Sequence, residues 1–98
     1  MRAQMAQNIE LIGKFATSKA GHDQDQLYVI VGCEGDFVYL CDGRLKPMAA
    51  PKKKRLKHIQ IINKTVNEEL LHKLINHEKV MDEEIRYAIK HAEDPTLF

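Results

Sequence analysis

The spacing of apolar residues changes once along the chain, near residue 64, and this change constrains the fold more than any other feature. Before it, short segments rich in β-branched and aromatic residues are separated by turn-forming residues, which is typical of β-strands. After it, apolar residues recur at intervals of three and four, which is typical of amphipathic helices. The sequence therefore predicts a mainly β fold with α-helices at its C-terminal end.

About five short strands are predicted. They lie within residues 11–19, 27–33, 37–41, 44–48 and 56–62. The turn-rich loop Ala20–Gln26 follows the first, and Glu34–Asp36 is predicted to close a tight hairpin between the second and third. Consecutive short strands with tight turns favour a small β-barrel, because a barrel hides its sheet edges.

Two short helices, predicted to form a C-terminal hairpin, follow the strands. Thr65 and Glu68 have the spacing of a capping box, and Asn67 is a second N-cap candidate. The apolar stripe of the first helix is Leu70, Leu71, Leu74 and Ile75. Asp82 opens the second helix. Residues 1–98 are predicted to be one domain, with the barrel in 11–63 and the helical extension in 65–93. The helices either pack on the barrel or on each other, bind a protein partner or shield the basic segment.

Positive charge is concentrated in one quarter of the chain. Residues 43–67 hold eight of the fifteen Lys and Arg residues and no Asp or Glu, whereas the whole chain has a net charge of +1. Such clusters bind polyanions through release of counterions. The predicted RNA-binding residues here are Arg44, Lys46, Lys52, Lys53, Lys54, Arg55, Lys57 and His58. A solvated charged loop is the plain alternative, and residues 51–57 also resemble a nuclear import signal.

The loop after the first strand is a second candidate site. Ser18, Lys19 and His22 offer a hydroxyl, an ammonium and an imidazole where two strands join, at the mouth of the predicted barrel. These groups suit phosphate and 2′-hydroxyl contacts. The alternative is an ordinary loop in which Gly21 and Asp23 supply turn geometry.

Residues 13–23, followed by the segment 27–32, resemble a KOW motif. With Asp42-Gly43-Arg44, the basic segment 51–58 and residues 82–86, the chain resembles the small KOW-domain RNA-binding proteins of Gram-positive bacteria over about residues 11–92. These are similar to KOW-type large-subunit ribosomal proteins. The resemblance implies an SH3-like barrel, RNA binding and a link to translation, and it places Lys19, Gly21 and His22 in the motif loop. Where KOW motifs commonly carry a glycine near the loop end, this chain has Asp25-Gln26.

The remaining reactive residues indicate neither catalysis nor a metal site. Cys33 and Cys41 are predicted to pair with Phe37 and Val29 across the hairpin, too far apart for a disulfide, and to be small buried hydrophobes. The five histidines lack metal-ligand spacing, and no nucleophile–base motif is present in the sequence. The chain shows no apolar run long enough for a membrane span and no signal peptide, so a reducing cytoplasm is expected.

The sequence thus predicts a non-catalytic RNA-binding protein, associated with the ribosome or translation, that needs no cofactor, small-molecule substrate or membrane. Ribosomal RNA is the expected partner. Few aromatic residues are available to stack on bases, so recognition by charge and shape is predicted. The alternative is a protein-interaction module, since SH3-like barrels host unrelated functions.

Overall fold

The structure is a computed structural model and describes residues 9–19 and 26–93. Within these residues, five antiparallel strands form one sheet in the order β4-β3-β2-β1-β5, followed by two helices. The elements are β1 (Lys14–Ser18), β2 (Tyr28–Glu34), β3 (Phe37–Cys41), β4 (Lys52–Arg55), η1 (Leu56–His58), β5 (Ile59–Thr65), α2 (Glu68–Ile75) and α3 (Asp82–Glu93). The predicted fold class, a small SH3-like barrel with a C-terminal helical hairpin, is confirmed.

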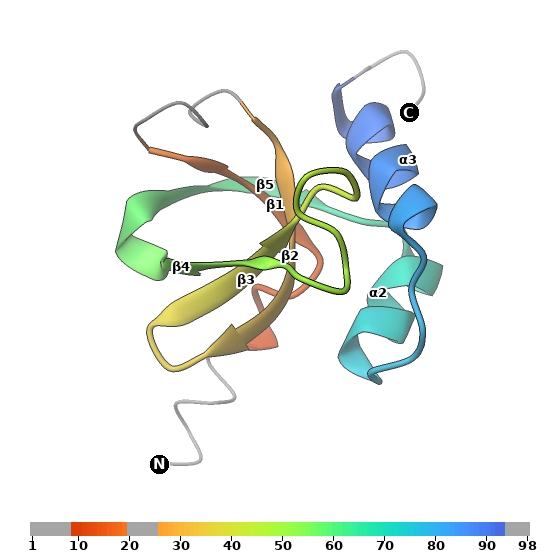
Figure 1. The fold of residues 1–98 in the computed structure, drawn as a ribbon, viewed down its shortest axis with the longest axis horizontal. Helices are drawn as coiled ribbons and strands as arrows, with labels where there is room; N and C mark the ends of the chain where they lie inside the picture. The colour runs from red at the N-terminus through yellow and green to blue at the C-terminus, as the bar shows by residue number, and fades with distance from the viewer. Residues whose placement is uncertain (1–8, 20–25, 94–98) are drawn as a thin grey trace.

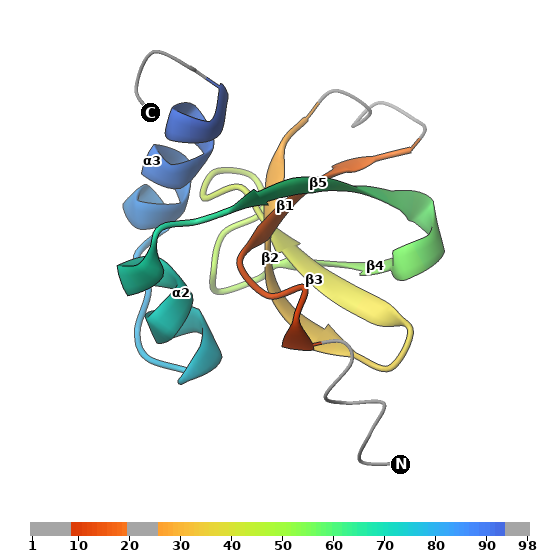
Figure 2. The ribbon, with the colours of Figure 1, turned by 180° about the vertical axis from the view of Figure 1, so that it is seen from behind.

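Two irregularities in strand pairing help the sheet to curl. The register shifts between Lys14 and Phe15 in β1 and between Ile30 and Gly32 in β2. Bulges of this kind bend a strand and increase its twist. The edge strands β4 and β5 are joined by η1, a single turn of 3₁₀ helix, which carries the chain around the open side of the barrel (Figure 1, Figure 2).

The described residues form two apolar cores separated by the sheet. The interior of the barrel holds Ala16, Tyr28, Ile30, Val38, Leu40 and Ile59. The second core joins Phe15, Val29 and Cys41 on the other side of the sheet to the buried faces of both helices. Three successive residues of β2, Tyr28 to Ile30, are buried because this strand is covered on both faces.

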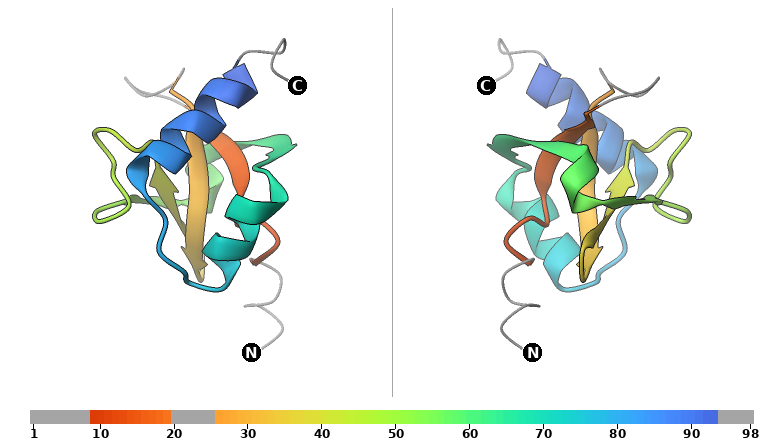
Figure 3. Two further views of the ribbon diagram at one scale, coloured as in Figure 1. Left: turned by 90° about the vertical axis from the view of Figure 1, so that its right-hand side faces the viewer. Right: turned by 90° about the vertical axis from the view of Figure 1, so that its left-hand side faces the viewer.

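The helices lie across one side of the sheet (Figure 3). The side chain of Asn67 caps α2, since its Oδ1 accepts a hydrogen bond from the Leu70 N–H at 2.8 Å. Leu70 and Leu74 of α2 and Ile85 of α3 are buried against the sheet. Full burial of Ile85 alone contributes roughly 2 kcal/mol. Three roles were predicted for the helices, and the structure shows that they pack on the barrel.

The side chain of Glu84 stabilises the first turn of α3. Glu84 Oε2 accepts a hydrogen bond from the Met81 N–H at 3.0 Å, and Glu84 Oε1 accepts one from Lys73 Nζ at 3.0 Å. The bond from Met81, and then the one from Lys73, lower the pKa of Glu84. Glu84 thus caps α3 and links it to α2.

Several predicted boundaries are wrong. Residues 44–48 form no strand, because Asp42 Oδ1 accepts the N–H groups of Arg44 at 2.8 Å and Lys46 at 2.9 Å and closes a turn instead. The strand β4 forms later, on the basic run itself. The last strand begins at Ile59 rather than within 56–58, which is η1. Thr65 ends β5, so it does not cap α2.

The β2–β3 hairpin loop is one residue shorter than predicted. Glu34 pairs with Phe37, and Gly35 adopts φ 60°, which suits glycine in a two-residue turn. Cys33 therefore pairs with Val38, not Phe37, whereas Cys41 pairs with Val29 as predicted. Both thiols are free. Cys41 is buried and Cys33 only partly so. No helix among the described residues is both long and apolar enough to cross a membrane.

Candidate nucleic-acid interface

The basic run forms an edge strand of the sheet. β4 consists of four consecutive cations and pairs on one side with β3. Because side chains alternate across a strand, the four cations divide into two pairs that face opposite ways. Lys52 and Lys54 are half-buried, whereas Lys53 and Arg55 are exposed.

The half-buried pair covers the barrel interior. Lys54 Nζ donates a hydrogen bond to Ser18 Oγ at 2.6 Å, and Lys52 Nζ lies 6.0 Å from the centroid of the Tyr28 ring. The aliphatic stems of such lysines pack on apolar residues while the ammonium groups reach polar ones. Ser18 is only 3% exposed. It therefore positions Lys54, and the predicted direct contact of Ser18 with RNA does not fit this geometry.

The exposed pair lies over two aromatic rings of β3. Lys53 Nζ is 4.5 Å from the centroid of Phe37 and 6.0 Å from that of Tyr39. Arg55 Cζ is 4.9 Å from the Phe37 centroid. The strand register explains this, since Phe37 pairs with Arg55 and Tyr39 with Lys53. We call Phe37, Tyr39, Lys53 and Arg55 the aromatic–cation face.

Glu34 borders the aromatic–cation face. Its Oε1 accepts a hydrogen bond from Tyr39 Oη at 2.6 Å and lies 3.9 Å from Lys53 Nζ. The hydrogen bond to Glu34 raises the pKa of Tyr39, with smaller contributions from burial and from the carboxylate charge. The tyrosine therefore stays protonated and its ring is held in one orientation.

The turn η1 and the end of β1 extend the positive surface. Lys57 and His58 are exposed on η1, which buries none of its residues. Lys19 is exposed and its N–H donates to the His58 carbonyl at 3.0 Å, so these residues are neighbours although they are far apart in sequence. We call Lys19, Lys53, Arg55, Lys57 and His58 the basic edge.

Two predicted residues lie away from the basic edge. Arg44 and Lys46 belong to the loop between β3 and β4, which reaches toward α3, whereas η1 lies on the opposite side of the barrel (Figure 1). Asp82 of α3 holds this loop by accepting the Met48 N–H at 2.7 Å. His22 lies outside the described residues. The structure thus groups some of the predicted cations and separates others.

Sequence reasoning missed Phe37 and Tyr39 as site residues. Their spacing of two in a predicted strand does place both rings on one face. Their position beside Lys53 and Arg55 depends on the β3–β4 register. The sequence instead predicts a strand at residues 44–48, between these two rings and the basic run. Because the strand next to β3 was predicted at the wrong residues, the pairing of the two rings with Lys53 and Arg55 could not be predicted.

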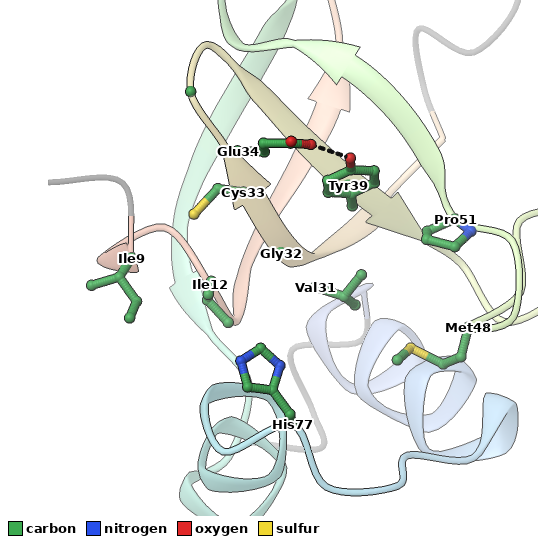
Figure 4. A pocket seen from close by; sticks show the side chains of 11 residues that line it. Ile9, Ile12, Val31, Gly32, Cys33, Glu34, Tyr39, Met48, Pro51 and His77 are labelled. Carbon is green, nitrogen blue, oxygen red and sulfur yellow. Dashed lines mark hydrogen bonds between the residues drawn. The ribbon is translucent and has the colours of Figure 1, made fainter. Parts of the chain in front are cut away.

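An apolar hollow adjoins Tyr39. It has a volume of about 770 Å³ and lies between β2, the segment before β1 and the loop between α2 and α3 (Figure 4). Its lining includes Ile12, Val31, Cys33, Tyr39, Met48 and His77. Burial raises the pKa of the Cys33 thiol, and that of Cys41 to about 11, so both are protonated near neutral pH.

Metal-ligating groups do not cluster in the part of the chain that the structure describes: no three His, Cys, Asp or Glu side chains there are placed to share an ion. In comparisons with known proteins, no family model and no curated protein matches the sequence.

Proposed function

We propose that this chain is a non-catalytic RNA-binding protein of the cytoplasm that acts on or near the ribosome and holds RNA phosphates on its basic edge. The observation that carries the proposal is the exposure of Lys53, Arg55 and Lys57 along an edge strand and the turn after it. A row of exposed cations suits a phosphate backbone, and each contact releases counterions. The resemblance to KOW-domain proteins supports RNA, and ribosomal RNA in particular, as the polyanion.

Salt-dependent binding tests the proposal. Ribosomal RNA binding is measured by fluorescence anisotropy at several salt concentrations for the wild type and for Lys53→Ala/Arg55→Ala. We expect weaker binding by the variant and a salt slope that falls by roughly 0.7 per lost phosphate contact with single-stranded RNA. The measurement is the slope of log affinity against log salt.

A matched control removes two charges elsewhere. Lys79→Ala/Lys90→Ala has the same net charge as the test variant, and both lysines are exposed in the helical region. This control should bind like the wild type. Equal losses in both variants would mean that only net charge matters, and the basic edge would then not be a site.

A protein-interaction module is the second candidate function. The apolar hollow beside Tyr39 favours it, because a concave apolar surface suits a side chain of a partner. If the wild type and Lys53→Ala/Arg55→Ala bind RNA equally weakly at every salt concentration, this candidate replaces RNA binding.

A further inference from the structure

The aromatic–cation face contains more than phosphate binding requires. Phe37 and Tyr39 are both partly exposed, and they stand two residues apart on β3, so their rings share one side of the sheet. Exposed cations alone would hold a backbone. The two rings add flat apolar surfaces next to those cations.

We propose that this face binds an unpaired nucleobase, so that the RNA recognised has a single-stranded nucleotide beside the phosphates on the basic edge. This inference rests on the RNA-binding function proposed above. Bases in single strands, loops and bulges stack on aromatic rings and on Arg guanidinium groups, whereas bases within an A-form duplex are already stacked on one another. Charge alone would not distinguish these two kinds of RNA.

The cations over the rings are placed to move onto phosphate. Lys53 Nζ lies 4.5 Å from the Phe37 centroid and 3.9 Å from Glu34 Oε1, and the Lys53 side chain is 49% exposed. Cation–π contacts and ion pairs at such exposed positions are weak. A phosphate therefore draws Lys53 off the ring, and the ring surface that it leaves becomes open to a base. Arg55 offers a planar group beside it.

The Tyr39 ring is already fixed for stacking. Its Oη donates to Glu34 at 2.6 Å, so little side-chain freedom remains to be lost on binding. The Glu34 carboxylate repels phosphate and can accept N–H groups from a base edge. Together these contacts place the backbone toward Arg55 and Lys57 and the base toward Tyr39.

Two synthetic RNAs with the same number of phosphates test the inference: a hairpin with an unpaired loop and a blunt duplex. We expect wild-type protein to prefer the hairpin. Phe37→Leu and Tyr39→Leu should each weaken hairpin binding about 5- to 100-fold while the salt slope stays unchanged, since stacking involves no counterions. Tyr39→Phe keeps the ring but loses the hydrogen bond to Glu34, so it should lose much less affinity than Tyr39→Leu. Circular dichroism of each variant checks that it folds.

Cross-linking of unaltered protein provides a second measurement. With 5-iodouridine in the hairpin loop, the expected photo-cross-link maps to Phe37 or Tyr39 by mass spectrometry. If hairpin and duplex bind equally and the Leu variants bind like the wild type, the stacking inference is overturned while phosphate binding stands. If the wild type binds neither RNA, the proposed function fails, and this inference fails with it.

Discussion

Gly43 sits where the loop after β3 meets α3, and it has no room for a side chain. Its φ is 76°, and an added Cβ would lie 2.5 Å from the Asp82 carbonyl oxygen and 2.9 Å from Arg86 Cγ. The Gly43 carbonyl also accepts a hydrogen bond from Arg86 Nη1 at 2.7 Å. This residue therefore allows the close approach that ties the loop to the helix.

We expect Gly43→Ala to destabilise the protein by more than about 2 kcal/mol, because a positive φ and a backbone clash act together. For a chain of this size that loss corresponds to a decrease of roughly 8–16 °C in Tm, measured by thermal unfolding. Gly35→Ala is the matched control. Gly35 also has a positive φ, of 60°, but an added Cβ there meets nothing within 4 Å. Similar losses in both variants would show that the contact between loop and helix is unimportant.

The hydrogen bond between Tyr39 and Glu34 makes a prediction about titration. Loss of the tyrosine proton breaks this bond and leaves a phenolate beside a carboxylate, so the pKa of Tyr39 is raised. Glu34→Gln should lower the pKa of Tyr39 toward its ordinary value of about 10. Ultraviolet absorbance of tyrosinate follows the titration. In a Tyr39→Phe background the same substitution should leave the titration curve of the other tyrosines unchanged, and a shift there would contradict the assignment.

At the scale of elements, the N-terminus of α3 depends on the charge of Glu84. The pKa of this carboxyl is lowered, chiefly by the Met81 N–H, so its contribution to stability is present above the unfolded-state pKa of about 4.3 and is lost as pH falls through the lower folded-state value. Glu84→Gln should cost about 0.5 kcal/mol near neutral pH, or roughly 2–4 °C in Tm.

The stability difference between Glu84→Gln and the wild type should shrink as the pH is lowered below 4, because the wild-type carboxyl is then protonated as well. Thermal unfolding at a series of pH values measures this. A Tm difference that stays constant down to the lowest pH would show that the carboxylate charge is not what stabilises the helix end.

The strand β4 shows what the sequence could and could not predict at this scale. Composition was enough to identify the basic run. Alternation in an edge strand then divides the run, so that Lys54 reaches a buried serine while Arg55 lies over an aromatic ring. That division depends on which residues pair with β3, and pairing between distant segments follows from tertiary packing and not from local preference. Element types were therefore more predictable than the site.

At the scale of the whole molecule, the fold places the basic and the acidic segments of the chain on different sides. β4 and η1 lie on one side of the barrel and the acidic helices on the other (Figure 1). If the protein binds RNA as proposed, the acidic side would repel an RNA held on the basic edge and so favour one binding orientation. The sequence predicted the unequal blocks of charge. These blocks lie on opposite sides because the helices pack on the sheet. The apolar periodicity of the helices did not decide between this packing and the two other roles.

Because β2 is buried on both faces, the barrel and the helices depend on each other to cover apolar surface. Phe15, Val29 and Cys41 form an apolar wall of the sheet, in one core with the buried residues of α2 and α3. A shorter gene product that ended after β5 would display this wall to its neighbours and self-associate. A barrel transferred into another protein without its helices would expose the same apolar surface. Substitutions of these three residues must therefore be compatible with the packing of both α2 and α3.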